Sequence, residues 1–91
     1  MRAVRLPPEV QRAIRTLPPD LKRRVRAALD LIRAAPNSGK PLKRELQGWR
    51  SLPVGRIRII YRETRAVIEV GAIGPRTAIY RDAAERLGRK P

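Results

Sequence analysis

The chain has 91 residues, which is the size of one small domain spanning residues 1–91. It contains no cysteine and no histidine, which excludes disulfides, thiolate or imidazole metal ligands, and the side chain that most often transfers protons near neutral pH. Any catalysis must therefore use Arg, Lys, Tyr, Ser, Thr, Asp or Glu, and we expect no metal and no cofactor.

Basic residues dominate the charged positions. Lys and Arg number 22 against 8 Asp and Glu, which gives a net charge of +14, and only four of the 22 are lysine. A positive field of this strength attracts polyanions and predicts contact with nucleic acid. A need for solubility or a genome bias would explain Arg in place of Lys, but explains less well the shortage of compensating acidic residues.

The apolar residues are too scattered for a membrane protein. Their runs are short and interrupted by arginine, whereas a membrane-spanning helix needs about 20 apolar residues in succession. The N-terminal residues 1–5 also lack the apolar core of a secretory signal. We therefore expect a cytoplasmic protein with no membrane contact.

The first third of the chain predicts a helical hairpin. Two Pro-Pro pairs, at 7–8 and 18–19, each predict a helix start, because proline is tolerated in the first turn. Residues 2–6 ahead of them are a candidate edge strand. Apolar residues follow each pair at helical spacing. They are Val10, Ala13, Ile14 and Leu17 in the first helix, and Leu21, Val25, Ala28, Leu29 and Ile32 in the second.

The rest of the chain predicts a sheet and a last helix. Residues 36–41 form a loop that ends the second helix, and the segments 49–54, 56–63 and 66–73 are Val- and Ile-rich strands of an antiparallel meander. Alternation along the middle strand places Ile57, Ile59 and Tyr61 on one face, opposite Arg58 and Ile60. Residues 78–87 predict a short C-terminal helix. The expected fold is a two-layer α+β domain.

Motifs spread over nearly the whole chain resemble the RelE/ParE toxin superfamily. The most specific is the Val-Gly-x-x-Arg-Ile-Ile-Tyr stretch at 54–61, combined with a later Gly-x-Arg at 74–76 and a tyrosine at 80. Weaker matches are Leu17-Pro18, the loop from 36 to 43, and Leu46-x-Gly48. The resemblance implies an N-terminal helical hairpin packed on a curved antiparallel sheet of three to four strands, with a short C-terminal helix.

This resemblance implies one of two activities. RelE-like members cut messenger RNA in the decoding site of the ribosome without a metal, whereas ParE-like members bind and poison DNA gyrase and generally lack the catalytic residues. In both cases the protein is the toxin of a type II toxin–antitoxin pair. Its expected partners are a cognate antitoxin and, in the RelE-like case, messenger RNA and the ribosome with its ribosomal RNA.

RelE-like members use two arginines, a late tyrosine and basic residues on the preceding strand. The matching positions are Arg58, Arg76, Tyr80 and Arg50. A further basic position just ahead of Val-Gly is Pro53 in this chain, a departure that removes a proton donor or phosphate contact and puts the cleavage rate in doubt. Additional RNA contacts are expected from basic residues outside this set, namely Arg23, Arg26, Lys40, Lys43 and Arg56.

The chemistry of RNA cleavage is consistent with the same residue types. When the 2′-hydroxyl of RNA attacks the adjacent phosphate, it needs a base, positive charge for the phosphorane and an acid for the leaving oxygen. Without histidine, a tyrosine can act as the base, because nearby guanidinium groups favour its phenolate form. Guanidinium also suits phosphate, to which it donates two parallel hydrogen bonds.

Each of these residues also has a purely structural interpretation. Arginine occupies about one position in five, so Arg58 or Arg76 alone proves little, and Tyr80 could cap the core with its hydroxyl in water. Tyr61 and Trp49 are expected to be core residues. Three hypotheses remain open: an mRNA endonuclease toxin, a ParE-like gyrase inhibitor without a catalytic site, and a decayed toxin that only binds RNA or its antitoxin.

Overall fold

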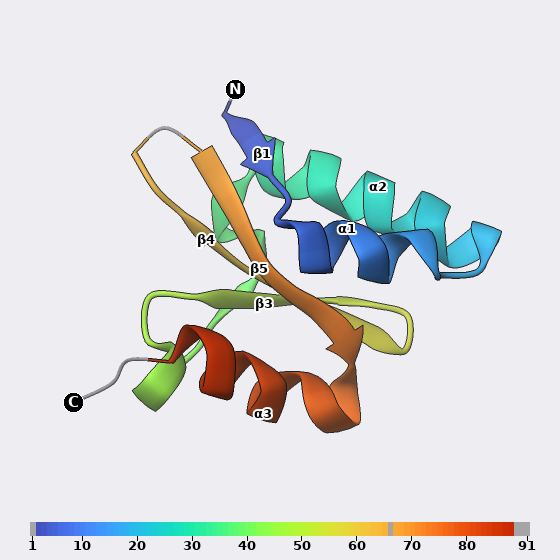
Figure 1. The fold of residues 1–91 in the computed structure, drawn as a ribbon. Coiled ribbons are helices and arrows are strands. Elements are labelled where there is room, and N and C mark those ends of the chain that lie inside the picture. The colour runs from blue at the N-terminus through green and yellow to red at the C-terminus, as the bar shows by residue number, and fades with distance from the viewer. Residues whose placement is uncertain (1, 66, 89–91) are drawn as a thin grey trace.

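The structure, a computed structural model, describes residues 2–65 and 67–88. Its elements run along the chain as three helices, five strands and two short 3₁₀ turns (Figure 1). Their bounds are β1 Ala3–Arg5, α1 Pro8–Arg15, α2 Pro19–Ala34, β2 Lys40–Pro41, β3 Arg50–Val54, β4 Ile57–Glu63, β5 Val67–Pro75 and α3 Arg76–Leu87, with the 3₁₀ turns at Pro36–Ser38 and Arg44–Leu46. The predicted α+β class is confirmed.

All three helices begin at or directly after a proline. Pro8 and Pro19 occupy the first turns of α1 and α2, as predicted, because a missing N–H costs nothing there. Helix α3 begins at Arg76, after Pro75, and is therefore two residues longer at its start than the sequence predicted. In the described part of the chain, no helix combines the length and apolar content needed to cross a bilayer.

The sheet has the strand order β1-β5-β4-β3-β2. Strands β3, β4 and β5 form the predicted antiparallel meander, although the predicted start of the last strand at Ala66 lies outside the described residues. Strand β1 confirms the expected edge strand, but it runs parallel to β5. The two-residue strand β2 lies in the predicted loop, since two residues are too short to show a period. The sheet is consequently five-stranded and mixed.

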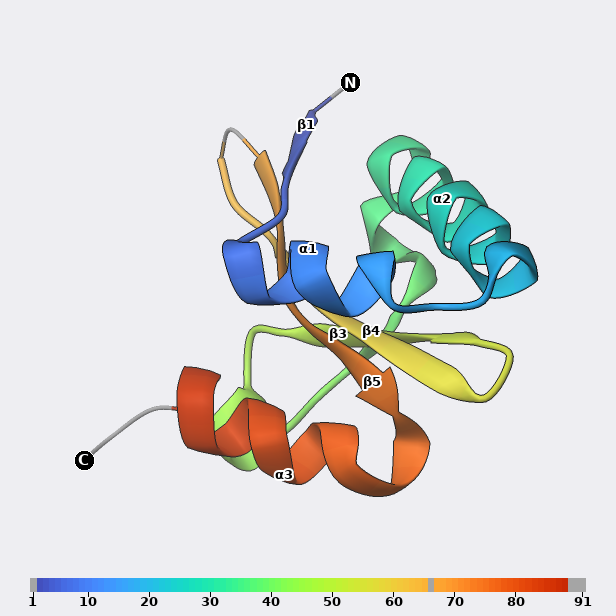
Figure 2. The ribbon, with the colours of Figure 1, turned by 45° about the vertical axis from the view of Figure 1, so that its right-hand side comes forward.

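The helical hairpin covers one face of the sheet (Figure 2). The apolar stripes of α1 and α2 pack against alternate residues of the strands, as the period-two pattern predicted for β4. Tyr61, expected in the core, is fully buried there. The buried members of this core are Val10, Leu21, Val25, Ala28, Ile32, Val54, Ile57, Ile59, Tyr61, Ile68 and Val70.

Helix α3 covers part of the opposite face, where it builds a second, smaller core. This explains why Ile60 occurs among the arginines of β4: it is fully buried beneath α3. Trp49, expected to be a packing residue, is also buried in this core, and the guanidinium of Arg62 lies 4.4 Å from the centre of its ring. The core consists of Leu46, Trp49, Ile60, Ala72, Ile79 and Ala83.

Gly71 lets α3 approach the sheet closely. The register between β4 and β5 shifts between Ile60 and Tyr61, whose partners Ala72 and Val70 leave Gly71 unpaired at a bulge. A Cβ at Gly71 would lie 2.6 Å from the Trp49 ring and would also collide with Leu87. The Gly71 carbonyl instead accepts a hydrogen bond of 3.0 Å from Arg86 of α3. The position of α3 therefore depends on a missing side chain.

Candidate functional site

An open pocket of about 570 Å³ lies between the β2–β4 part of the sheet and the start of α3. Strand register explains which side chains meet in it, because Lys40 pairs with Ser51 and Pro53 pairs with Arg58, and cross-strand partners share a face. Helix α3 adds residues from its first turns. The pocket is lined by Ser38, Lys40, Leu42, Ser51, Pro53, Arg58, Arg76 and Tyr80.

The structure thus brings three of the four predicted catalytic residues together. Arg58 comes from β4, whereas Arg76 and Tyr80 come from α3. Tyr80 is 37% exposed, so its ring is accessible from the pocket. Its hydroxyl lies 2.9 Å from the Oγ of Ser51, which is a hydrogen bond between the helix and the sheet.

The pocket is strongly cationic because its positive charges have no acidic neighbours in its lining. Lys40, Arg58 and Arg76 line it together, and no Asp or Glu does. Among the described residues, the five ion pairs use other arginines, namely Arg2, Arg23, Arg33, Arg62 and Arg86. Unpaired cations that converge on a partly enclosed site concentrate the positive potential there and attract an anionic group such as phosphate.

Arg50, the fourth predicted catalytic residue, does not line this pocket. Its Nη1 donates a hydrogen bond of 2.7 Å to the carbonyl of Gly39, which leaves Arg50 half-buried. Gly39 directly precedes Lys40, so this contact helps to fix the segment that carries Lys40 into the pocket. A catalytic role for Arg50 stays a prediction, and the observed contact gives it a structural one.

Tyr61 fixes the same segment from inside the hairpin core. Its hydroxyl donates to the carbonyl of Pro36 and accepts from the N–H of Gly39, both at 2.7 Å. Burial raises the pKa of Tyr61, an effect that the Gly39 N–H and the charge of Arg50 partly offset. A Cβ at Gly39 would lie 2.7 Å from the Tyr61 ring, so this close approach requires glycine.

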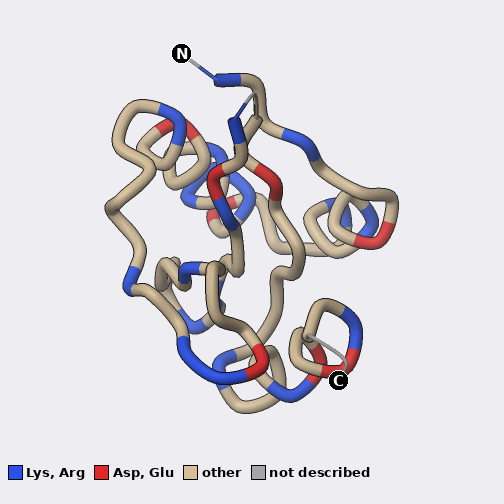
Figure 3. Tube along the Cα trace, turned by 90° about the vertical axis from the view of Figure 1, so that its left-hand side faces the viewer, with Lys and Arg blue, Asp and Glu red and all other residues tan. Residues whose placement is uncertain are grey.

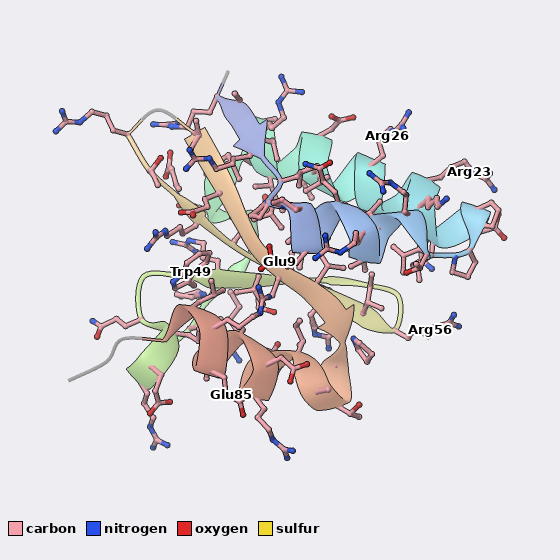
Figure 4. The ribbon with its side chains drawn as sticks, in the orientation of Figure 1. Glu9, Arg23, Arg26, Trp49, Arg56 and Glu85 are labelled. Atoms are coloured by element: carbon pink, nitrogen blue, oxygen red, sulfur yellow. The ribbon has the colours of Figure 1, made fainter. Side chains whose placement is uncertain are left out.

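The other predicted RNA contacts are spread over the surface. Basic residues occur in nearly every element of the chain (Figure 3). Arg23, Arg26 and Arg56 project outward at the end of the molecule formed by the start of α2 and the β3–β4 turn (Figure 4). Arg23 is paired with Asp20. Lys43 is exposed next to the second 3₁₀ turn, and of this set Lys40 alone lines the pocket.

Ser51 is the pocket residue that sequence reasoning missed. It is only 4% exposed and is the one buried polar residue in the described part of the chain. Alternation along β3 would have placed it on the same face as Pro53, but its contact with Tyr80 depends on how α3 packs. A local sequence pattern carries no signal for such a contact.

Comparison with known proteins identifies the family. A search of curated proteins found no match. The family described as "ParE toxin of type II toxin-antitoxin system, parDE" matches residues 4–80, a range that extends from β1 into α3 and includes the whole pocket. Toxins of this type are paired with a cognate antitoxin, and the predicted RelE/ParE resemblance is confirmed at this level. The chain therefore belongs to the ParE toxin family of type II toxin–antitoxin systems, within the RelE/ParE superfamily.

Proposed function

We propose that this toxin cuts messenger RNA on the ribosome and that the cationic pocket is its active site. The observation that supports this most directly is the convergence of Lys40, Arg58, Arg76 and Tyr80 from three separate elements, β2, β4 and α3, on one open pocket. Three cations match a phosphodiester and its transition state, and an accessible tyrosine beside them supplies an oxygen that can take up a proton.

The proposed reaction needs only groups present in the pocket and in RNA. The 2′-oxygen of the RNA forms a bond to the adjacent phosphorus, and its proton passes to the phenolate oxygen of Tyr80. The bond between phosphorus and the 5′-oxygen breaks, which leaves a 2′,3′-cyclic phosphate. The 5′-oxygen takes a proton from the ammonium of Lys40, since guanidinium groups do not release protons.

The two arginines stabilise charge in this reaction. Negative charge grows on the phosphorane oxygens, and the donors of Arg58 and Arg76 are in place before the reaction begins, because both side chains come from regular elements that line the pocket. The absence of carboxylates from the lining leaves their charge available for the phosphate. DNA lacks the 2′-hydroxyl and would not be cut in this way.

A second candidate function is inhibition of DNA gyrase without catalysis. Two observations favour it: the family is described by its ParE members, and exposed Pro53 occupies the wall of the pocket where RelE-like members carry a basic residue. In this case the pocket would bind no reacting phosphate, and its arginines would contribute only to binding of the target.

Parallel assays separate the two functions. Purified toxin is added to a cell-free translation reaction, in which primer extension maps mRNA cuts, and to a gyrase supercoiling reaction. We expect cuts that require translation, no loss of supercoiling, and strongly reduced cutting by Arg76→Ala. Arg12→Ala is the matched control, because it removes an exposed arginine from α1 on the other face of the sheet. Inhibited supercoiling with uncut mRNA would contradict the proposal.

A further inference from the structure

We infer that Ser51 is a positioning residue that holds the hydroxyl of Tyr80 in the pocket and thereby sets the rate of the proposed reaction. This inference rests on the proposed function and extends it to a residue on β3. Its basis is the 2.9 Å hydrogen bond between Ser51 Oγ and Tyr80 Oη, which connects the floor of the pocket to α3.

The surroundings of Ser51 favour such a role. A buried hydroxyl is costly unless it is hydrogen-bonded, yet Ser51 is 4% exposed between Lys40 of β2 and Ile60 of β4. Tyr80 supplies the partner that offsets this cost. Because the strand backbone fixes Ser51, its Oγ provides a rigid reference point for a side chain on a surface helix.

The contact restricts the part of Tyr80 that matters for chemistry. The Tyr80 side chain is more than one-third exposed, so packing alone holds it loosely at its tip. A hydrogen bond at the tip fixes the ring torsions and keeps Oη on the side of the pocket lined by Lys40 and Arg58. Once Tyr80 carries a negative charge, the Ser51 hydroxyl donates to it and stabilises the form that accepts the proton.

A different role for Ser51 is direct contact with the RNA, since it also lines the pocket. The two roles predict different behaviour when Tyr80 has no hydroxyl. A positioning residue acts through Tyr80 Oη, so its removal has no further effect in Tyr80→Phe. A residue that contacts RNA directly still contributes in that background, and the two losses multiply.

The experiment is a double-mutant cycle on the full chain with Ser51→Ala, Tyr80→Phe and the combined variant, measured by single-turnover cleavage of mRNA on stalled ribosomes. Ser51→Ala should lower the rate at saturation roughly threefold to tenfold, the effect of one hydrogen bond of ordinary strength, while the half-saturating concentration stays the same. Ser51→Thr keeps a hydroxyl and should restore most of the rate. Thr16→Ala is the control, because it removes a hydroxyl that donates to Ala13 at the end of α1, far from the pocket lining.

Melting curves and tyrosine ¹³Cζ resonances of the same variants provide readouts that do not require cleavage. We expect the Tyr80 resonance to move in Ser51→Ala, and the combined variant to lose less in melting temperature than the sum of the single variants. If the wild type cuts no RNA but these couplings are present, the proposed function fails while the Ser51–Tyr80 contact stands. An unchanged Tyr80 resonance, or a further loss of cleavage on adding Ser51→Ala to Tyr80→Phe, would overturn the inference.

Discussion

On the α1–α2 face of the sheet, eleven buried residues form one continuous core, whereas on the α3 face six buried residues form a smaller core beside an open, cationic pocket. The first face is covered by two helices and the second by one short helix that leaves β2 and the ends of β3 and β4 accessible. The difference indicates that stability comes mainly from the hairpin face, and that the uncovered half of the other face is available for binding and chemistry.

The strongest test of this division is Tyr80→Phe, which changes one atom at the pocket. We expect cleavage of translated mRNA to fall by roughly 10²–10⁴, the usual loss of an acid–base group, while the melting temperature changes little because the ring remains. Primer extension and a melting curve measure the two effects. Full cleavage by this variant would end the assignment of Tyr80 as the base and leave only electrostatic stabilisation by the arginines.

The two cores should respond differently to truncation. Ile32→Ala, in the hairpin core, should lower the free energy of unfolding by about 2–5 kcal/mol and leave the cleavage rate of the folded protein unchanged. Ile79→Ala weakens the packing of α3 directly beside Tyr80, and should lower cleavage as well, by up to about 10²-fold through misplacement of the pocket residues. Denaturant unfolding and single-turnover cleavage below the unfolding transition check both. Equal effects on cleavage would remove the proposed division.

Tyr61 links the two faces, because it is buried in the hairpin core but holds the segment that leads to Lys40. Tyr61→Phe leaves the Gly39 N–H and the Pro36 carbonyl without their partner and should cost about 1–3 kcal/mol of unfolding free energy. Since burial raises the pKa of Tyr61, its contribution to stability is complete below about pH 10 and is lost as the pH rises through the pKa of the folded state.

Denaturant unfolding between pH 8 and 11 measures this dependence. The wild type should lose stability in the alkaline range, and Tyr61→Phe should lose less, because the phenylalanine does not titrate. Tyr80→Phe is the comparison, since it removes the other tyrosine of the chain. Equal alkaline destabilisation of Tyr61→Phe and the wild type would show that Tyr61 does not cause the effect.

The smallest expected effect concerns charge outside the pocket. Arg26→Ala removes an exposed arginine of α2 that the structure places outside the described ion pairs. It should weaken RNA binding modestly and reduce the salt dependence of log K by about 1. The cleavage rate of the saturated complex should stay the same, in contrast to Arg76→Ala. Binding titrations at several salt concentrations test this, and a slope that is flat even in the wild type would contradict electrostatic RNA binding.

Much of the architecture could be predicted from the sequence, because local patterns determine local structure. The two Pro-Pro pairs and the helical spacing after them predict α1 and α2, and the alternation of Ile57, Ile59 and Tyr61 with arginine predicts which face of β4 the hairpin covers. The composition alone also excluded imidazole and thiolate chemistry and predicted an anionic partner.

Only the tertiary structure decided how these elements combine into a site. The pairing of Lys40 with Ser51 and of Pro53 with Arg58, the packing of α3 over Gly71, and the contact of Arg50 with Gly39 all join residues distant in sequence. Periodicity specifies which side of a strand a residue faces but not which residue lies opposite, since register and helix docking depend on the packing of the whole chain. For this reason Arg58, Arg76 and Tyr80 could be predicted from motifs, whereas Ser51 became visible only when α3 was seen against the sheet.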